Sequence, residues 1–417
     1  MRDDLAYLGV SDRFEIRVRN AGACIVSSAL VACASDPQPE WCAAEAGEPV
    51  VVAGAASRWE QDGVALRFTE LWRAGGLNEG EELAFPISTA VAVDGRLAIA
   101  DFQLGEAIVV NPDGTWDGSW TRTGSGPGEV RSPLGAAWDD AGNLLVYNIA
   151  RHRIVRLLAA RALRDEIEVP PELGAPIMEA GGLAWTATTG EGAIYIEPLL
   201  PPFDNVPSEA TAVAIRWMPG QAGVDTIVRV RVPIIPLDQH TGTILPGAAR
   251  PVIAPAAGGT FAVGGTASGY VVRVMGDEGE PIRTICRNTP SLPLTDVERG
   301  EAAPPGWDPG PELERTLAAI RAARRPEPAP FGRMFYDAVG RLWVQRDRAT
   351  PFSVDQVYGV AGAAFDLFAT SGEWLGETRA PATARILAAT ADRAYALEES
   401  DEGTLWLVAY RLHLDPS

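Results

Sequence analysis

The chain has 417 residues, of which 47% are hydrophobic, so it has enough apolar material for a sizeable core and is not a disordered protein. Its formal net charge of -20 opposes binding to nucleic acid or to an anionic membrane surface, because both need a basic protein face. All 35 basic residues are arginine.

The N-terminal segment has the layout of an export signal. Arg17 and Arg19 precede an apolar run over residues 21–32, which is too short to span a bilayer and ends in Leu-Val-Ala-Cys at Cys33. These last four residues resemble a bacterial lipobox, although the four acidic residues before the apolar run are unusual there. We expect residues 1–33 to be a signal peptide and lipobox, with Cys33 lipidated and the protein exported and anchored to the cell envelope, on the periplasmic or outer membrane side.

Residues 34–62 are polar and proline-containing, as a tether should be. Two cysteines remain beyond the signal and the lipobox, Cys42 and Cys286, and their spacing leaves open whether they pair. The sequence contains no Cys-x-x-Cys motif and no Cys/His cluster, which disfavours a structural zinc site.

From residue 63 onward, a pattern of short apolar strands recurs six times. A glycine stands in the turn between the first and second strands of five units, at Gly95, Gly142, Gly192, Gly259 and Gly340. Such turns suit tight hairpins, and units of roughly 40 to 50 residues are typical of a β-propeller. Residues 63–76 alternate in hydrophobicity and precede the first unit, so we expect them to supply the outer strand of the last blade and close the ring.

The stretch NLLVYNIARHRIVRLL, ending at Leu158, resembles an NHL repeat, and the GSGPGEV stretch at residues 124–130 is similar to a connector between early blades in bacterial propellers of the NHL-like superfamily. This resemblance implies an all-β fold, a six-bladed β-propeller over residues 63–417. The connector does not fit a phosphate-binding loop, because a strand follows it, lysine is absent and Glu129 would repel a phosphate.

Residues 289–331 interrupt the repeats between units four and five and are predicted to be helical. Thr295 and Glu298 have capping-box spacing, and a helix is expected from Pro311 to the residues before Pro326. Leu313, Leu317 and Ile320 form one apolar stripe of this helix. The segment is interpreted as an insertion packed on the propeller, with a movable lid over a channel mouth as the alternative.

A ring of polar side chains is the candidate site. The positions that close the second strand of each unit carry side-chain oxygen in five of six cases, and pseudo-sixfold symmetry would bring them to one face of the channel. These candidates for ligand or metal binding are Asp101, Asn148, Glu197, Gln345 and Glu398. No cofactor is identified, but a divalent cation such as calcium would suit these oxygens.

Catalytic motifs are scarce in the sequence. Its three histidines are His152, which the NHL resemblance makes a packing residue, His240 in a loop and His413 on the last strand, and no Gly-x-Ser-x-Gly elbow occurs. These features favour a monomeric, membrane-tethered module that binds a small molecule, glycan or protein over an enzyme. The alternative is a metal-dependent, lactonase-like hydrolase or lyase with its site in the central channel.

Overall fold

A computed structural model describes residues 42, 48–76, 78, 80–170, 173, 185–199, 205–221, 223–236, 242–265, 269–304, 310–323, 328–350 and 355–416. The chain divides into two compact units, Met1–Pro39 and Glu40–Ser417. The first unit, with the predicted signal and Cys33, lies outside the described residues. No helix in the described part of the chain is long and apolar enough to cross a membrane.

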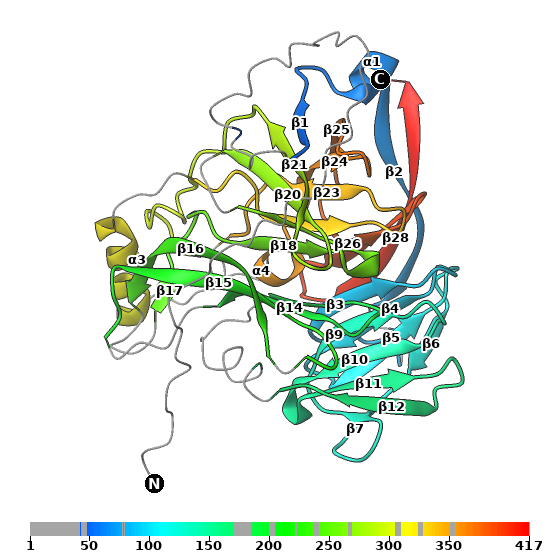
Figure 1. The fold of residues 1–417 in the computed structure, drawn as a ribbon. Coiled ribbons are helices and arrows are strands. Elements are labelled where there is room, and N and C mark those ends of the chain that lie inside the picture. Colours follow the sequence, from blue (N-terminus) through cyan, green and yellow to red (C-terminus); the bar gives the residue numbers. More distant parts are fainter. Residues whose placement is uncertain are drawn as a thin grey trace, which may run out of the picture. The chain divides into compact units, whose positions relative to one another are not determined.

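The described part of the second unit contains six sheets of four or five strands and one two-stranded pair (Figure 1). All neighbouring strands of the six sheets are antiparallel, except where β1 joins β21. The first three sheets, from the innermost strand outward, are β3 (Pro86–Val91), β4 (Leu97–Asp101), β5 (Glu106–Val110) and β6 (Trp116–Ser119); β9 (Pro133–Trp138), β10 (Leu144–Asn148), β11 (Arg153–Leu157) and β12 (Leu163–Glu168); and β13 (Trp185–Thr188), β14 (Ile194–Leu199), β15 (Glu209–Trp217), β16 (Asp225–Pro236) and β17 (Gly242–Ile244).

The remaining sheets complete the repeat. They are β18 (Val252–Pro255), β19 (Phe261–Gly264), β20 (Tyr270–Met275), β21 (Pro281–Arg287) and β1 (Val50–Ala53); β22 (Arg333–Tyr336), β23 (Leu342–Gln345), β24 (Ala364–Phe368) and β25 (Trp374–Arg379); and β26 (Arg385–Ala389), β27 (Arg393–Glu399), β28 (Leu405–Pro416) and β2 (Val64–Gly75). Strands such as β4, β10 and β24 are apolar almost throughout and buried along their whole length, as expected of short strands that are covered on both faces.

The six sheets follow one another in a closed cycle of contacts, through their innermost strands except at β14, the second strand of the third sheet. β3 contacts β9, β9 contacts β13, β14 contacts β18, β18 contacts β22, β22 contacts β26, and β26 returns to β3. Apolar side chains fill the space between successive sheets, as where Trp343 and Phe365 of the fifth sheet share a buried cluster with Val408 and Leu412 of the sixth. A closed order of face-to-face sheets is the arrangement of a β-propeller.

The turns predicted between first and second strands are confirmed. Gly95, Gly142, Gly192, Gly259 and Gly340 all have φ between +76° and +88°. Backbone of this kind strains any residue with a Cβ atom, so glycine is the natural choice at these positions.

The predicted closure by residues 63–76 is also confirmed. β2 runs antiparallel to β28 over almost its whole length, from Val64 opposite Pro416 to Gly75 opposite Trp406. An early strand thus completes the sheet formed by the last three strands of the chain, which removes the exposed edge of β28.

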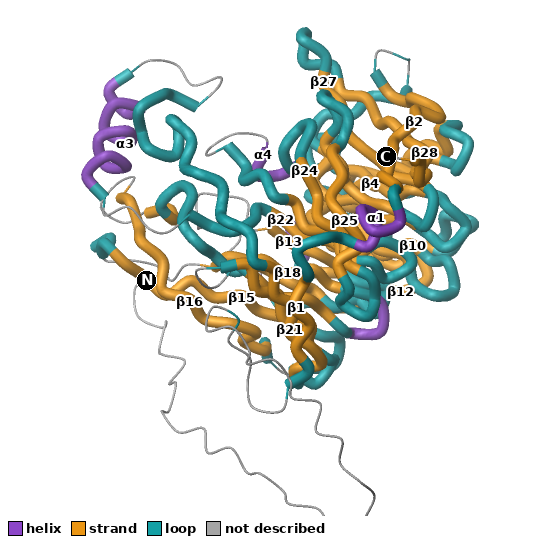
Figure 2. Tube along the Cα trace, turned by 90° about the horizontal axis from the view of Figure 1, so that it is seen from above, coloured by secondary structure: helices purple, strands orange, loops and turns teal. Residues whose placement is uncertain are grey.

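Part of the segment expected as a tether, residues 34–62, is folded onto the domain. β1 adds to the edge of β21, a disulfide joins Cys42 to Cys286 of β21, and helix α1 (Arg58–Asp62) contacts β25 (Figure 2). A Cβ atom on Gly376 would lie only 2.3 Å from the nearest ring atom of Trp59 in α1. The absence of a side chain at Gly376 therefore makes room for the indole. We call residues 42–75 the strap, because they join the outer strands of three successive sheets.

The region between β21 and β22 contains helix α3 (Pro311–Ala322), which starts at the predicted residue. Leu313, Leu317 and Ile320 are buried as the stripe predicted, and they pack with Ile235 of β16 and Leu245. Thr295 and Glu298 make both hydrogen bonds of a capping box, yet residues 296–300 form turns rather than a helix. The helix was expected to reach the residues before Pro326; α3 ends at Ala322, and residues 324–327 lie outside the described residues.

Candidate functional site

A cavity of about 600 Å³ lies among the innermost strands of the sheets. Residues of β3, β9, β18, β22 and β26 line it, together with residues 189–191 after β13. Small side chains such as Ser88, Ala90, Ala136 and Ala388 leave this space open. Cavities of this size, with mostly apolar walls, are where proteins bind small molecules.

Charged side chains of both signs line the cavity. Asp140 and Glu191 stand in exposed positions on turns between first and second strands. Arg283 of β21 and Arg333, the first residue of β22, line the cavity as well, together with Tyr358 of helix α4 (Asp355–Tyr358). The wall therefore has no single sign of charge.

Arg333 is the cation deep in this wall. Its Nη1 donates a hydrogen bond to Tyr358 O at 3.2 Å, and its guanidinium lies 5.9 Å from the centroid of the Phe335 ring. Burial lowers the pKa of Arg333 to about 10, so the side chain is still cationic at neutral pH. It keeps some accessible surface although protein surrounds it, as expected of a side chain that faces an internal cavity.

Two tyrosines and a carboxylate of the wall have structural surroundings that define them. Burial raises the pKa of Tyr336 to about 12, and burial with the nearby Asp101 carboxylate raises the pKa of Tyr358 as well. Both hydroxyls therefore stay protonated and are not poised for proton transfer near neutral pH. Asp337 accepts hydrogen bonds from Arg341 Nε at 2.6 Å and Trp343 Nε1 at 3.1 Å, which stabilise the turn after β22.

The predicted ring residues do not line the cavity, as far as their side chains are described. Asp101 is fully buried at the end of β4, and its carboxylate accepts hydrogen bonds from the backbone N–H groups of Ala84, Phe85, Gln103 and Leu104 at 2.8 to 3.1 Å. This carboxylate holds the start of β3 and the turn after β4 together.

Asn148 and Gln345 have similar local roles. Asn148 Nδ2 donates to Glu129 O at 3.3 Å, which ties β10 to the connector, while its Oδ1 is buried and accepts no hydrogen bond among the described residues. Gln345 Nε2 donates to Asp347 O at 2.7 Å, and its Oε1 accepts from Val360 N at 3.4 Å. Both amides stabilise the chain at the ends of their strands.

Glu398 joins the closing strand to its sheet. Its carboxylate accepts hydrogen bonds from Tyr410 of β28 and from Arg73 of β2, the latter at 3.0 Å. Glu197 belongs to β14, but its side chain lies outside the described part of the chain. Among the described residues, no three His, Cys, Asp or Glu side chains form a group that could hold a metal ion. Metal binding by the ring stays a prediction, which these local contacts do not favour.

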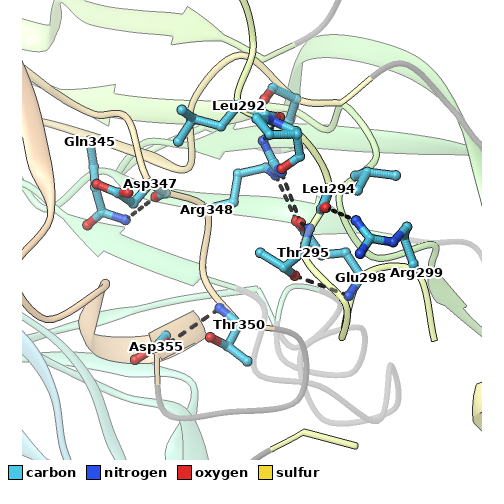
Figure 3. Close-up of polar contacts among 12 residues, drawn as sticks. Leu292, Leu294, Thr295, Glu298, Arg299, Gln345, Asp347, Arg348, Thr350 and Asp355 are labelled. Carbon is cyan, nitrogen blue, oxygen red and sulfur yellow. Dashed lines mark hydrogen bonds and ion pairs between the residues drawn. The ribbon is translucent and has the colours of Figure 1, made fainter. Parts of the chain in front are cut away.

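Gln345 lies beside a network that joins β23 to the region containing α3 (Figure 3). Arg348 Nε and Nη2 donate to Glu298 Oε1 and Oε2 at 2.7 and 2.9 Å, and Arg348 also donates to the carbonyls of Leu292 and Pro293. The Glu298 and Arg348 side chains are 2% and 8% exposed. This buried pair anchors the proline-rich segment after β21.

The two described histidines are not part of the cavity. His152 has φ of +49° at the turn between β10 and β11, and His413 of β28 lies 3.3 Å from Asp415. His240, the loop histidine of the sequence, is outside the described residues. No histidine or cysteine lines the described cavity wall.

The glycine-rich connector, residues 124–130, forms a turn that the carboxylate of Glu129 fills. Short strands β7 (Arg122–Thr123) and β8 (Glu129–Val130) pair in parallel, and Glu129 Oε2 accepts a hydrogen bond from Gly126 N at 2.6 Å. A Cβ on Gly124 would meet the same oxygen at 2.0 Å. The carboxylate therefore occupies the place that a phosphate would need.

Sequence reasoning missed Arg333 because it examined the ends of the second strands. The available signal was the position of Arg333 itself, a charged residue at the start of the apolar innermost strand RMFY. An innermost strand faces the channel, so a charge on it is more informative than a polar residue at a strand end.

No protein-family model and no curated protein sequence matches this chain. Among solved structures, it is similar to a member of the DUF4221 family from Bacteroides vulgatus, with 13% identity, 84% of this chain and 99% of that chain covered, and a TM-score of 0.50. It is also similar, with a TM-score of 0.39, to a gluconolactonase from Xanthomonas campestris that is 14% identical, with 83% of this chain and 90% of that chain covered. A third similar structure, with a TM-score of 0.38, is the calcium-binding protein regucalcin from Agrobacterium tumefaciens, which is 10% identical, with 87% of this chain and 96% of that chain covered. At these identities the likeness is one of fold, and that fold is of the β-propeller type.

Proposed function

We propose that this protein is an exported, six-bladed β-propeller that binds a small molecule in its central cavity. The observation that carries this proposal is the cavity of about 600 Å³ with a largely apolar wall. The six described sheets and the closed cycle of their inner strands support six blades around that cavity.

The chemistry of the wall favours binding over catalysis. Hydrolysis by a side-chain nucleophile needs a base beside it, whereas Ser88 in the cavity accepts a hydrogen bond from Ala136 N through its Oγ and no histidine lines the described wall. The carboxylate of Glu191 accepts from Gly258 N at 3.1 Å. We therefore propose a binding module in preference to a lactonase-like enzyme.

Filling the cavity tests this proposal. Ala388 of β26 lines the cavity, so Ala388→Trp should occupy it, whereas Ala160→Trp places the same indole on an exposed turn between β11 and β12. N-phenyl-1-naphthylamine, a neutral apolar dye that fluoresces in apolar surroundings, should bind the wild type and Ala160→Trp with one site and equal affinity. Its affinity for Ala388→Trp should fall at least tenfold, and equal binding by all three proteins would refute the cavity as the site.

We also propose that the protein is held in the cell envelope by lipid on Cys33. The Cys42–Cys286 disulfide supports export, because such bonds persist in oxidising compartments. The Cys33→Ser variant should move from the membrane to the soluble fraction of the envelope when the producing cells are fractionated. A variant that stays in the membrane fraction would contradict a lipid anchor at this residue.

A further inference from the structure

The cavity extends to different depths along the inner strands. Of β9, β18 and β26, only the later part lines it, from Ala136, Pro255 and Leu387 onward. In contrast, β3 lines the cavity from its first residue, Pro86, and β22 from its first residue, Arg333. The cavity therefore runs from the turns that follow the inner strands to the place where β3 and β22 begin.

The end of the cavity at the turns is open to water. Asp140, Glu191 and Ala338 line the cavity there, and all three are exposed on turns between first and second strands. This end offers a ligand an entrance that needs no helix or strand to move.

Helix α4 lies at the other end of the cavity. Its residues Val357 and Tyr358 line the cavity, and Tyr358 is only 3% exposed. The ring of Tyr358 packs edge-on against Phe85, the residue before β3, with 5.9 Å between the ring centroids. Tyr358 O accepts a hydrogen bond from Arg333 Nη1 of β22 at 3.2 Å. The helix thus bridges the starts of β3 and β22 and closes the cavity between them.

Several contacts fix α4 in this place. Asp355 Oδ1 lies 3.4 Å from Nη2 of Arg385 at the start of β26, and Asp355 Oδ2 accepts a hydrogen bond from Thr350 N at 3.4 Å (Figure 3). After the helix, Val360 N donates to Gln345 Oε1 of β23, also at 3.4 Å. These contacts, with the one from β22, make α4 a fixed part of the cavity wall.

We propose, building on the cavity function above, that Val357 and Tyr358 of α4 form the floor of the cavity and thereby set the longest apolar chain that it accepts. A ligand enters at the turns, and its apolar chain extends along β3 and β22 toward Tyr358. Each CH₂ group that fits buries more apolar area, so affinity rises with chain length until the chain meets the tyrosine ring. The additional carbon atoms of longer chains stay in water at the entrance, and affinity rises no further.

A series of straight-chain alcohols measures this limit. Alcohols are neutral, which suits a wall that carries charges of both signs. They should displace N-phenyl-1-naphthylamine from the wild-type protein with about fourfold higher affinity for each added CH₂ group, up to a chain length at which the gain stops. In Tyr358→Ala the gain should continue for about two further CH₂ groups, because removal of the ring deepens the cavity.

Further variants separate the role of the floor from a general loss of packing. Val357→Phe adds bulk at the closed end and should stop the gain at a shorter chain, whereas Tyr358→Phe keeps the ring and should restore the wild-type limit. Tyr195 of β14 is 1% exposed and does not line the cavity. Tyr195→Ala therefore removes a buried ring elsewhere and should keep the wild-type limit even where it destabilises the fold.

The outcomes distinguish this inference from the proposed function. If Ala388→Trp blocks the dye but Tyr358→Ala and Val357→Phe keep the wild-type limit, the cavity binds ligands and α4 is not its floor. If the wild type binds no dye, or Ala388→Trp does not block it, the proposed function itself fails. A limit that moves to longer chains in Tyr358→Ala and to shorter chains in Val357→Phe supports the inference. Should Tyr358→Ala not fold, the shift in Val357→Phe alone decides.

Discussion

At the scale of single residues, buried charges in the described part of the chain are compensated by the protein itself. Glu298 and Arg348 neutralise each other through two hydrogen bonds, and Asp101 is satisfied by backbone N–H groups. These contacts stabilise the fold, because a buried charge without a partner would destabilise it.

The Glu298–Arg348 pair makes a testable contribution to stability. Replacing one partner of a buried ion pair leaves the other charge uncompensated, so Glu298→Gln should lower the free energy of unfolding by about 3 kcal/mol, measured by urea denaturation at pH 7. The control Glu373→Gln removes a half-exposed partner 3.7 Å from Arg58 and should cost less than about 1 kcal/mol. Equal losses of unfolding free energy in the two variants would show that the buried pair stabilises the fold no more than an exposed pair does.

The same pair predicts a pH dependence. Burial alone would raise the pKa of Glu298, but its hydrogen bonds with Arg348 and Thr295 outweigh burial and lower this pKa from the ordinary value of 4.5. A carboxyl group whose pKa is lowered by folding contributes stability above its unfolded pKa and loses that contribution as the pH falls through the folded value. The stability gap between the wild type and Glu298→Gln should therefore narrow below pH 4.5.

At the scale of elements, the strap has a distinct role. β1, α1 and β2 join the outer strands β21, β25 and β28, and the Cys42–Cys286 disulfide fixes the beginning of the strap. Thr284 of β21 adds a hydrogen bond from its N–H to Pro49 O at 2.9 Å. The chain thereby links three neighbouring sheets at their exposed edges.

Breaking the disulfide should loosen this strap. The double variant Cys42→Ala/Cys286→Ala should lose about 2 to 4 kcal/mol of unfolding free energy, as is usual when a native disulfide is removed. Dithiothreitol should destabilise the wild type by a similar amount and speed proteolysis within residues 50–57. The reductant should have no effect on the double variant, and an unchanged wild type would contradict a stabilising role for the bond.

The sequence predicted the repeated elements better than their contacts. Turn glycines and the start of α3 followed from local rules, because hairpin turns and helix caps depend on neighbours in sequence. The closing strand followed from alternation and from the need of a ring of repeats to close. The folding of β1 and α1 onto β21 and β25 could not be predicted, since these segments continue no repeat and their partners lie more than 200 residues away. A central channel was expected, but its lining residues were missed, because that lining forms only when distant inner strands come together.

At the scale of the whole molecule, the closed cycle of inner strands creates the site. Small side chains of β3, β9 and β26 and larger ones of β22 line it together, and they leave a space that no single sheet could enclose.

The most direct test of the central claim is a crystal structure of the domain soaked with 4-iodobenzoate, an apolar carboxylate whose iodine gives an anomalous signal. The account predicts an iodine peak within the cavity lined by β3, β22 and β26. Iodine bound only on the outer surface, with the cavity unoccupied at a saturating concentration, would contradict it.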